Sequence, residues 1–105
     1  MNPDVIYESI ISAGESWADA EAAAAMLEET RKSVLAKCMN ESDATSIAAK
    51  EMYALADPEY RKFVEGMVQA RKAANKARVR YDSAKVLAEL RRSQESSRRA
   101  EMQIR

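Results

Sequence analysis

The sequence contains no histidine and only one cysteine, Cys38, and these two absences exclude much of enzyme chemistry. Without histidine the chain cannot build a serine or cysteine nucleophile triad, an HExxH zinc site or a Glu-x-x-His di-iron site. A lone cysteine can form neither an internal disulfide nor a cysteine zinc site, so we interpret Cys38 as a small buried hydrophobic residue. We therefore expect a non-enzymatic protein with no catalytic residue, no metal and no cofactor.

Glycine, proline and long apolar runs are also scarce. The two glycines, Gly14 and Gly66, are isolated, which excludes a glycine-rich phosphate loop. The longest run of small apolar residues, 22–27, is far shorter than the roughly 20 residues of a membrane span, and the first residues carry no basic region of the signal-peptide type. We expect a cytoplasmic protein with no membrane partner.

Abundant alanine, glutamate, lysine, arginine and methionine favour helix over sheet. Each proline follows Asn or Asp and precedes an acid, in Asn2-Pro3-Asp4 and Asp57-Pro58-Glu59, which is the pattern of a capped helix start. A third start lies near residue 42, where Asn40 or Ser42 can cap. The sequence predicts helices at about 3–39, 43–56 and 58–103, with Gly14 marking either a kink near residues 12–16 or a close contact between helices.

Two apolar seams with alternating spacings of three and four residues predict coiled-coil-like packing. The first helix carries Ile6, Ile10, Ala13, Trp17, Ala20, Ala24, Leu27, Arg31, Val34 and Cys38, a seam interrupted only by Arg31. The third helix carries Phe63, Met67, Ala70, Ala74, Ala77, Tyr81, Ala84 and Ala88, whose alanines allow close approach of a partner helix.

A second apolar stripe runs along nearly the opposite side of the third helix and consists of Val64, Val68, Val79, Val86 and Leu90. A helix that is apolar on two faces needs two partners. We predict an all-α, single-domain fold: an elongated antiparallel hairpin of the two long helices, with the short helix capping its apex or continuing, kinked at Pro58, into the third. Homo-oligomerisation, a dimer first, would cover the second stripe; a helix of another protein is the alternative.

The formal net charge of zero hides a separation of charge along the chain. Residues 1–30 hold seven acidic and no basic side chains, whereas residues 71–105 hold eleven basic and four acidic ones. An antiparallel hairpin places these segments side by side, so we expect much of the positive charge to be neutralised within the fold. The stretch 93–105 has lost the apolar seam and is predicted to fray.

The basic third helix also supports an alternative, binding of nucleic acid through Arg91, Arg92, Arg98 and Arg99. Aromatic residues that could stack on bases are missing there, because Tyr81 is the only aromatic residue after Phe63 and lies on the seam. Neighbouring acids also offer partners within the helix, pairing Arg78 with Asp82, Lys85 with Glu89 and Arg91 with Glu95. These features favour a role of the charges in structure or in protein binding.

The segments 70–81 and 98–102 of the third helix resemble small helical proteins encoded in tailed-phage and prophage genomes. The resemblance implies an intracellular phage product in a bacterial host and supplies no site residues. Together with the unpartnered stripe, it leads us to expect a protein-interaction and oligomerisation protein that acts stoichiometrically on a host or phage factor.

Overall fold

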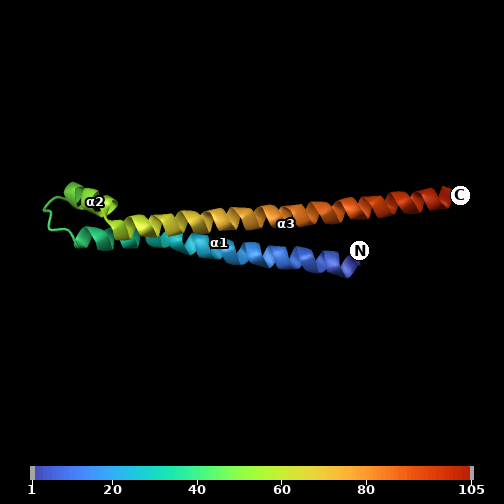
Figure 1. The fold of residues 1–105 in the computed structure, drawn as a ribbon, viewed down its shortest axis with the longest axis horizontal. Helices are drawn as coiled ribbons and strands as arrows, with labels where there is room; N and C mark the ends of the chain where they lie inside the picture. The colour runs from blue at the N-terminus through green and yellow to red at the C-terminus, as the bar shows by residue number, and fades with distance from the viewer. Residues whose placement is uncertain (1, 105) are drawn as a thin grey trace. The chain divides into compact units, whose positions relative to one another are not determined.

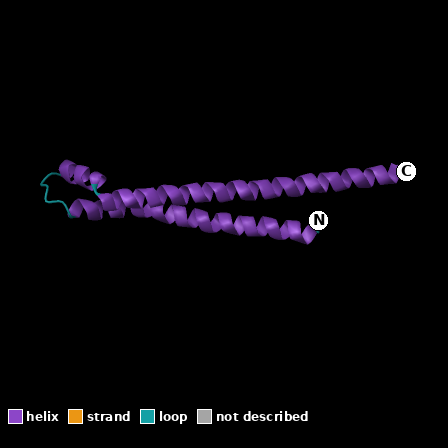
Figure 2. Ribbon diagram, viewed as in Figure 1, coloured by secondary structure: helices purple, strands orange, loops and turns teal. Residues whose placement is uncertain are grey.

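A computed structural model describes residues 2–104 of the chain, and of Ile104 only the backbone. Three α-helices follow one another: α1 spans Pro3–Asn40, α2 spans Ile47–Ala56 and α3 spans Pro58–Ile104 (Figures 1 and 2). No strand occurs among the described residues. The all-α prediction is confirmed, and the predicted bounds of the two long helices agree with α1 and α3 within one residue.

Both Asx-Pro helix starts are confirmed by their hydrogen bonds. The amide of Asp4 donates to the side-chain oxygen of Asn2 at 3.0 Å, and the amide of Glu59 donates to Asp57 Oδ1 at 2.8 Å. Asp57 has extended backbone angles, φ −65° and ψ 127°, so α2 ends before α3 begins. The proline after each cap fits the first helical position, where an amide hydrogen would have no helical acceptor.

The predicted start of the second helix at residue 43 is wrong by four residues. Asn40 is still part of α1, and Ser42 accepts a hydrogen bond from the Ala44 amide at 3.1 Å within the connecting loop. The cap of α2 is Ser46, whose hydroxyl accepts from the Ala49 amide at 3.1 Å. Each serine accepts from a nearby amide, Ser42 from the amide two residues on and Ser46 from the amide three residues on, so local sequence did not distinguish the loop turn from the helix cap.

The described residues divide into two compact units. The central unit comprises residues 19–74, and the terminal unit comprises residues 2–18 together with 75–104. Each unit contains part of α1 and part of α3 in antiparallel pairing, since Glu21 contacts Arg71 and Lys37 contacts Glu59 in the central unit. In the terminal unit Gly14 lies against Tyr81, while Pro3 shares a groove with Glu95. The predicted hairpin pairing is therefore present in both units.

The central unit has a small core in which all three helices take part. Cys38 and Ala54 are fully buried and Tyr60 is 5% exposed. Val34, Leu35, Met39 and Val64 pack against them. Arg31, the one polar residue of the first seam, is half-buried and donates through Nη1 to the Tyr60 hydroxyl at 3.3 Å. The polar interruption of the seam thus has a hydrogen-bond partner, as burial requires.

The terminal unit is a pair of helix segments joined along their seams. The Trp17 and Tyr81 rings stack with centroids 5.5 Å apart and an interplanar angle of 27°. Gly14 lies beside this stack: an added Cβ would be 3.2 Å from Tyr81 Cε1. Helix α1 runs unbroken through residues 12–16, so of the two interpretations of Gly14 the close helix contact is confirmed.

Every seam residue predicted for either helix is buried or half-buried. Beyond Glu95, α3 continues past the first residues of α1 within the terminal unit (Figure 1). All side chains from Arg92 to Gln103 are exposed, yet the backbone stays helical to Ile104. The predicted loss of the seam after residue 93 is confirmed, whereas fraying stays a prediction, and residue 105 lies outside the described residues.

Candidate interaction surface on α3

In the terminal unit, the face of α3 that looks away from α1 exposes several large apolar side chains. Ala77, Tyr81, Ala84 and Ala88 form the covered seam, and residues on the opposite side of the helix have no neighbouring element within the described part of this unit. Four large apolar side chains lie there, with exposed fractions of 64%, 55%, 49% and 57% for Val79, Val86, Leu87 and Leu90. We call these four residues the α3 stripe.

The α3 stripe has the spacing of a helix-packing seam. Val79, Val86 and Leu90, together with Ser83 between them, follow each other at intervals of four, three and four residues, as in a coiled coil. The stripe residues, Asp82 and Ser83 line an open groove of about 480 Å³. Singly exposed apolar residues are ordinary, but a contiguous set at this spacing is typical of an interaction surface.

The structure separates the five residues predicted to form the second stripe. Val79, Val86 and Leu90 belong to the α3 stripe of the terminal unit. Val64 is half-buried and packs against the core of the central unit, and Val68 in the same unit is 53% exposed. Val64 therefore has a partner inside its own unit. Leu87, which the sequence analysis missed, lies one residue after Val86 and is identifiable from the helical periodicity alone.

The two edges of the α3 stripe differ in charge. At about 100° per residue, Asp82 and Glu89 lie along one edge, and Arg80, Leu87 and Gln94 lie along the other. Arg78 Nε and Lys85 Nζ lie 3.9 Å and 3.7 Å from Asp82 carboxylate oxygens. Asp82 is thus partly compensated by Arg78 and Lys85, whereas Glu89 has no ion-pair partner among the described residues, and between residues 80 and 94 the opposite edge carries no acid.

Only part of the predicted charge pairing within α3 is present. The Arg78–Asp82 pair is confirmed. Lys85 contacts Asp82 instead of Glu89 and also places Nζ 4.5 Å from the centroid of the Tyr81 ring. Among the described residues, Arg91 and Glu95 are not within ion-pair distance, although both line a groove of about 270 Å³ with Ile6 and Ile10.

The four arginines predicted as nucleic-acid contacts do not share one environment. Arg91 is half-buried, and its Nε atom is inaccessible with no hydrogen-bond partner among the described residues. Arg92, Arg98 and Arg99 are exposed, and no carboxylate of the described residues lies within ion-pair distance of them. Three of the four are therefore placed at an accessible surface, whereas Arg91 lies against α1.

The predicted neutralisation between α1 and α3 is carried by one arginine of the central unit. Arg71 donates to Glu21 at 2.6 Å and to both carboxylate oxygens of Glu28 at 2.9 and 2.6 Å. These hydrogen bonds lower the pKa of Glu28 and raise that of Arg71, with Glu28 the larger cause of the arginine's shift. In the described part of the terminal unit no ion pair joins α1 to α3. Much of the positive charge there has no acidic contact across the helices.

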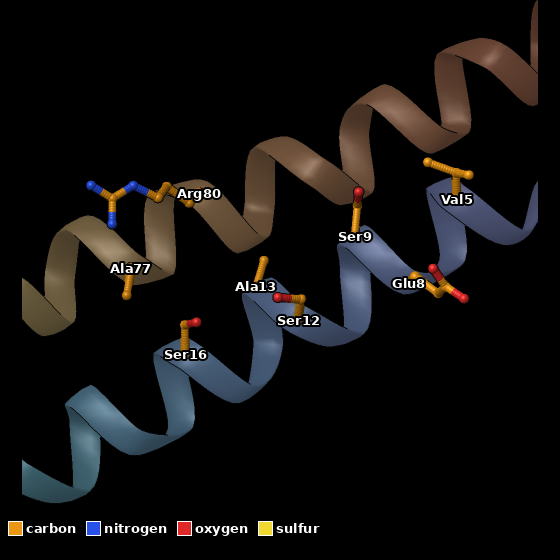
Figure 3. A pocket seen from close by; sticks show the side chains of 8 residues that line it. All are labelled: Val5, Glu8, Ser9, Ser12, Ala13, Ser16, Ala77 and Arg80. Carbon is orange, nitrogen blue, oxygen red and sulfur yellow. The ribbon is translucent and has the colours of Figure 1, made fainter.

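A third groove in the terminal unit, about 510 Å³ in volume, lies where small α1 side chains face α3 (Figure 3). Ser9, Ser12, Ala13 and Ser16 line it from α1 and Arg80 borders it from α3. No histidine, cysteine or pair of acids lines it. The groove results from small side chains at the edge of the seam and contains no set of groups suited to catalysis.

The only group of three potential metal ligands among the described residues lies in the central unit, where Cys38, Glu41 and Asp57 bring ligand atoms within 4.8 Å of one another. Burial, followed by the nearby carboxylates Asp57, Glu59 and Glu41, raises the pKa of the Cys38 thiol. One oxygen of Asp57 already caps α3. A protonated, buried thiol is a poor metal ligand, so these residues are better explained by the core and the helix cap.

No described helix is both long and apolar enough to cross a membrane. Comparison with known proteins adds no relative: no family model, no curated protein and no solved structure matches this chain.

Proposed function

We propose that this protein is a small non-enzymatic interaction protein that self-associates through the α3 stripe and acts by stoichiometric binding to another protein. The observation that carries the proposal is the stripe itself: four large apolar side chains, each 49–64% exposed, of which Val79, Val86 and Leu90 lie at coiled-coil spacing on a helix whose other face in this unit is covered. Exposure of such a face to water is unfavourable, and packing against a second helix removes the apolar area from water.

The resemblance of the third helix to phage-encoded helical proteins supports a proposal about where the protein acts and what it binds. We propose a cytoplasmic product of a phage or prophage, with a host or phage protein as its target. A chain without histidine, in which the described groove between α1 and α3 gathers neither a pair of acids nor a thiol, is suited to binding and not to turnover.

The proposal is tested by size-exclusion chromatography with light scattering at about 50 µM protein, a concentration at which weak association of micromolar affinity is populated. The unmodified chain is expected to elute as a dimer. The double variant Val79→Glu/Val86→Glu is expected to elute as a monomer with unchanged helical circular dichroism. In a dimer the glutamates of the two copies would be buried against each other's stripe without positively charged partners.

A matched control is Met26→Glu/Met102→Glu, which makes the same change of charge at residues that are 69% and 70% exposed and lie outside the stripe. This control should remain dimeric. A monomeric unmodified chain, or a double stripe variant that still dimerises, would contradict the proposal.

The exposed arginines of α3 support a second candidate, an accessory nucleic-acid-binding function. The observation in its favour is that Arg92, Arg98 and Arg99 have no acidic contact among the described residues. Such side chains can neutralise phosphates, and the affinity would fall steeply with salt.

This candidate predicts that single- or double-stranded oligonucleotides shift the protein peak to an earlier elution volume and a larger molar mass at low salt and not at moderate salt. Changing Arg92, Arg98 and Arg99 to Ala should abolish the shift, while Arg91→Ala should weaken it little because Arg91 lies against α1. Absence of any shift at low salt eliminates the candidate and leaves the proposal of self-association untouched.

A further inference from the structure

We infer that the occupant of the α3 stripe is a second copy of this chain, packed in parallel and in register with the first. The inference rests on the proposed self-association and adds the direction and register of the helices. It is drawn from two independent features of the described residues: the sequence of layers along the stripe and the unequal charge of its two edges.

Each inward-facing residue of the stripe would form one layer of a two-helix contact. The order of these residues favours an arrangement in which each residue faces its own copy. Between Val79 and Ser97 the inward positions of the stripe are, in order, Val79, Ser83, Val86, Leu90, Ser93 and Ser97. A parallel, in-register pair sets each valine and leucine on its own copy, and sets each serine on a serine whose hydroxyl can accept or donate. An antiparallel pair that overlaps the apolar segment places Ser83 opposite Val86, which leaves a hydroxyl facing an apolar side chain.

The charges along the two edges of the stripe also favour a parallel pair of helices. In an antiparallel pair the edges of one kind meet, so that Asp82 of each copy lies beside Glu89 of the other and two carboxylate pairs form, in which Arg78 and Lys85 compensate Asp82 but not Glu89. In a parallel pair the acidic edge meets the opposite edge: Asp82 meets Leu87, and Glu89 meets Gln94. No like charges are then brought together between these edges. Lys76 occupies the inward position before Val79, so the apolar part of the stripe begins at Val79.

The stripe also leads into a part of α3 that α1 does not cover. Leu90, Ser93, Ser97 and Arg98 line an open groove of about 360 Å³ on this face. The small side chains of Ser93 and Ser97 allow two helices to approach closely, so the contact of a second copy can extend from the stripe along the uncovered segment.

Disulfide trapping tests the direction. In a parallel pair Ser97 faces its own copy, so the variant Ser97→Cys should form a covalent dimer under a glutathione redox buffer. In the antiparallel arrangement the two copies of residue 97 lie roughly 37 Å apart along the helices, far beyond the reach of a disulfide. The control Ser96→Cys makes the same chemical change at an exposed neighbour about 100° away from the stripe centre.

The expected result is a Ser97→Cys dimer that forms at least about ten times faster than the Ser96→Cys dimer. The unmodified chain, whose only cysteine is the buried Cys38, reports the background. Light scattering of the reduced variants is measured alongside. A non-covalent dimer in which Ser97→Cys does not cross-link overturns the parallel arrangement and leaves self-association standing.

A second pair of variants gives the antiparallel arrangement its own positive signal. Val79→Cys and Leu90→Cys should each cross-link alone if the helices are parallel. Cross-linking only in the mixture of the two variants overturns the inference, because residue 79 faces residue 90 in the antiparallel overlap. A monomer at about 100 µM overturns both the inference and the proposed function.

Discussion

The central and terminal units use the same two helices but are held together by different interactions. In the central unit three helices enclose Cys38, Ala54 and Tyr60, and Arg71 bridges to two acids of α1. In the terminal unit only two helix segments meet, through an aromatic stack and small residues, and no ion pair among the described residues crosses between them.

This difference also decides how much of the second apolar side of α3 each unit covers, although Val68 of the central unit is itself 53% exposed. Val64 of the central unit packs against the core to which α2 contributes Ala54, whereas Val79 and Val86 of the terminal unit have no such element beside them. A third helix allows a unit to bury a second apolar face of α3 internally. A unit of two helix segments leaves that face exposed.

The largest effect is expected from removing the core tyrosine of the central unit. Tyr60→Ala creates a cavity beside Cys38 and removes the hydroxyl that accepts from Arg31, so the free energy of unfolding should fall by about 3 kcal/mol. Thermal unfolding followed by circular dichroism measures the loss. Tyr53→Ala, at a tyrosine that is 50% exposed in α2, is the control and should cost much less.

The same variant tests whether the two units are stabilised separately. Trp17 is the only tryptophan and lies in the terminal unit, so its fluorescence reports that unit alone. In Tyr60→Ala the circular dichroism transition should shift further than the Trp17 transition. Equal shifts of both signals would contradict separate stabilisation.

An intermediate effect is expected at the close contact of the terminal unit. Gly14→Val adds branched carbon atoms where even a Cβ would lie 3.2 Å from Tyr81, and should destabilise the stack by about 1–2 kcal/mol. Gly14→Ala gains about 1 kcal/mol of helix propensity, which offsets a small shift of the ring, and should be nearly neutral. Unfolding followed by Trp17 fluorescence distinguishes the two, and a neutral valine variant would contradict the tight contact.

The smallest of the three effects is expected from Arg71→Met, because its ion pairs are largely accessible to solvent. The folded pKa of Glu28 lies below its ordinary value of 4.5, so the stabilisation is fully present above about pH 4.5 and is lost as the pH falls through the folded pKa. The melting temperature of the unmodified chain should therefore exceed that of the variant at about pH 7, and the difference should shrink towards about pH 3.

Salt provides a second measurement on the same pair, since about 1 M NaCl shortens the Debye length to about 3 Å and should reduce the difference. Lys72→Met is the matched control: it removes one positive charge from the next residue, which is exposed and outside the ion pairs of the described residues. A Lys72 variant with the same pH and salt response would show that net charge, not the Arg71 bridge, causes the effect.

Local patterns predicted most of the fold because helix starts and seams depend on nearby residues. The caps at Asn2 and Asp57 need only a side-chain oxygen two residues before a free amide. Seam positions follow from helical periodicity, which is why the predicted seam residues are buried or half-buried. The start of α2 was missed because Ser42 and Ser46 both offer a hydroxyl to a nearby amide.

The candidate surface was predictable in part. Val79, Val86 and Leu90 were identified from periodicity, and Leu87 could have been. Val64 was assigned to the same surface because the sequence cannot show that the core around Tyr60 reaches it. The charges were the hardest to predict: long arginine side chains can reach several acids, and only the packed helices determine that Arg71 bridges Glu21 and Glu28.

The sequence by itself determined that this chain forms helices with capped starts and that the longest of them is apolar on two sides, since propensity, capping and periodicity act over a few residues. Only the tertiary structure decided which part of the second apolar side is buried. Burial depends on what lies within a few ångströms in space, and the helix contacts that cover Val64 and leave Val79 exposed join residues that are far apart in the chain.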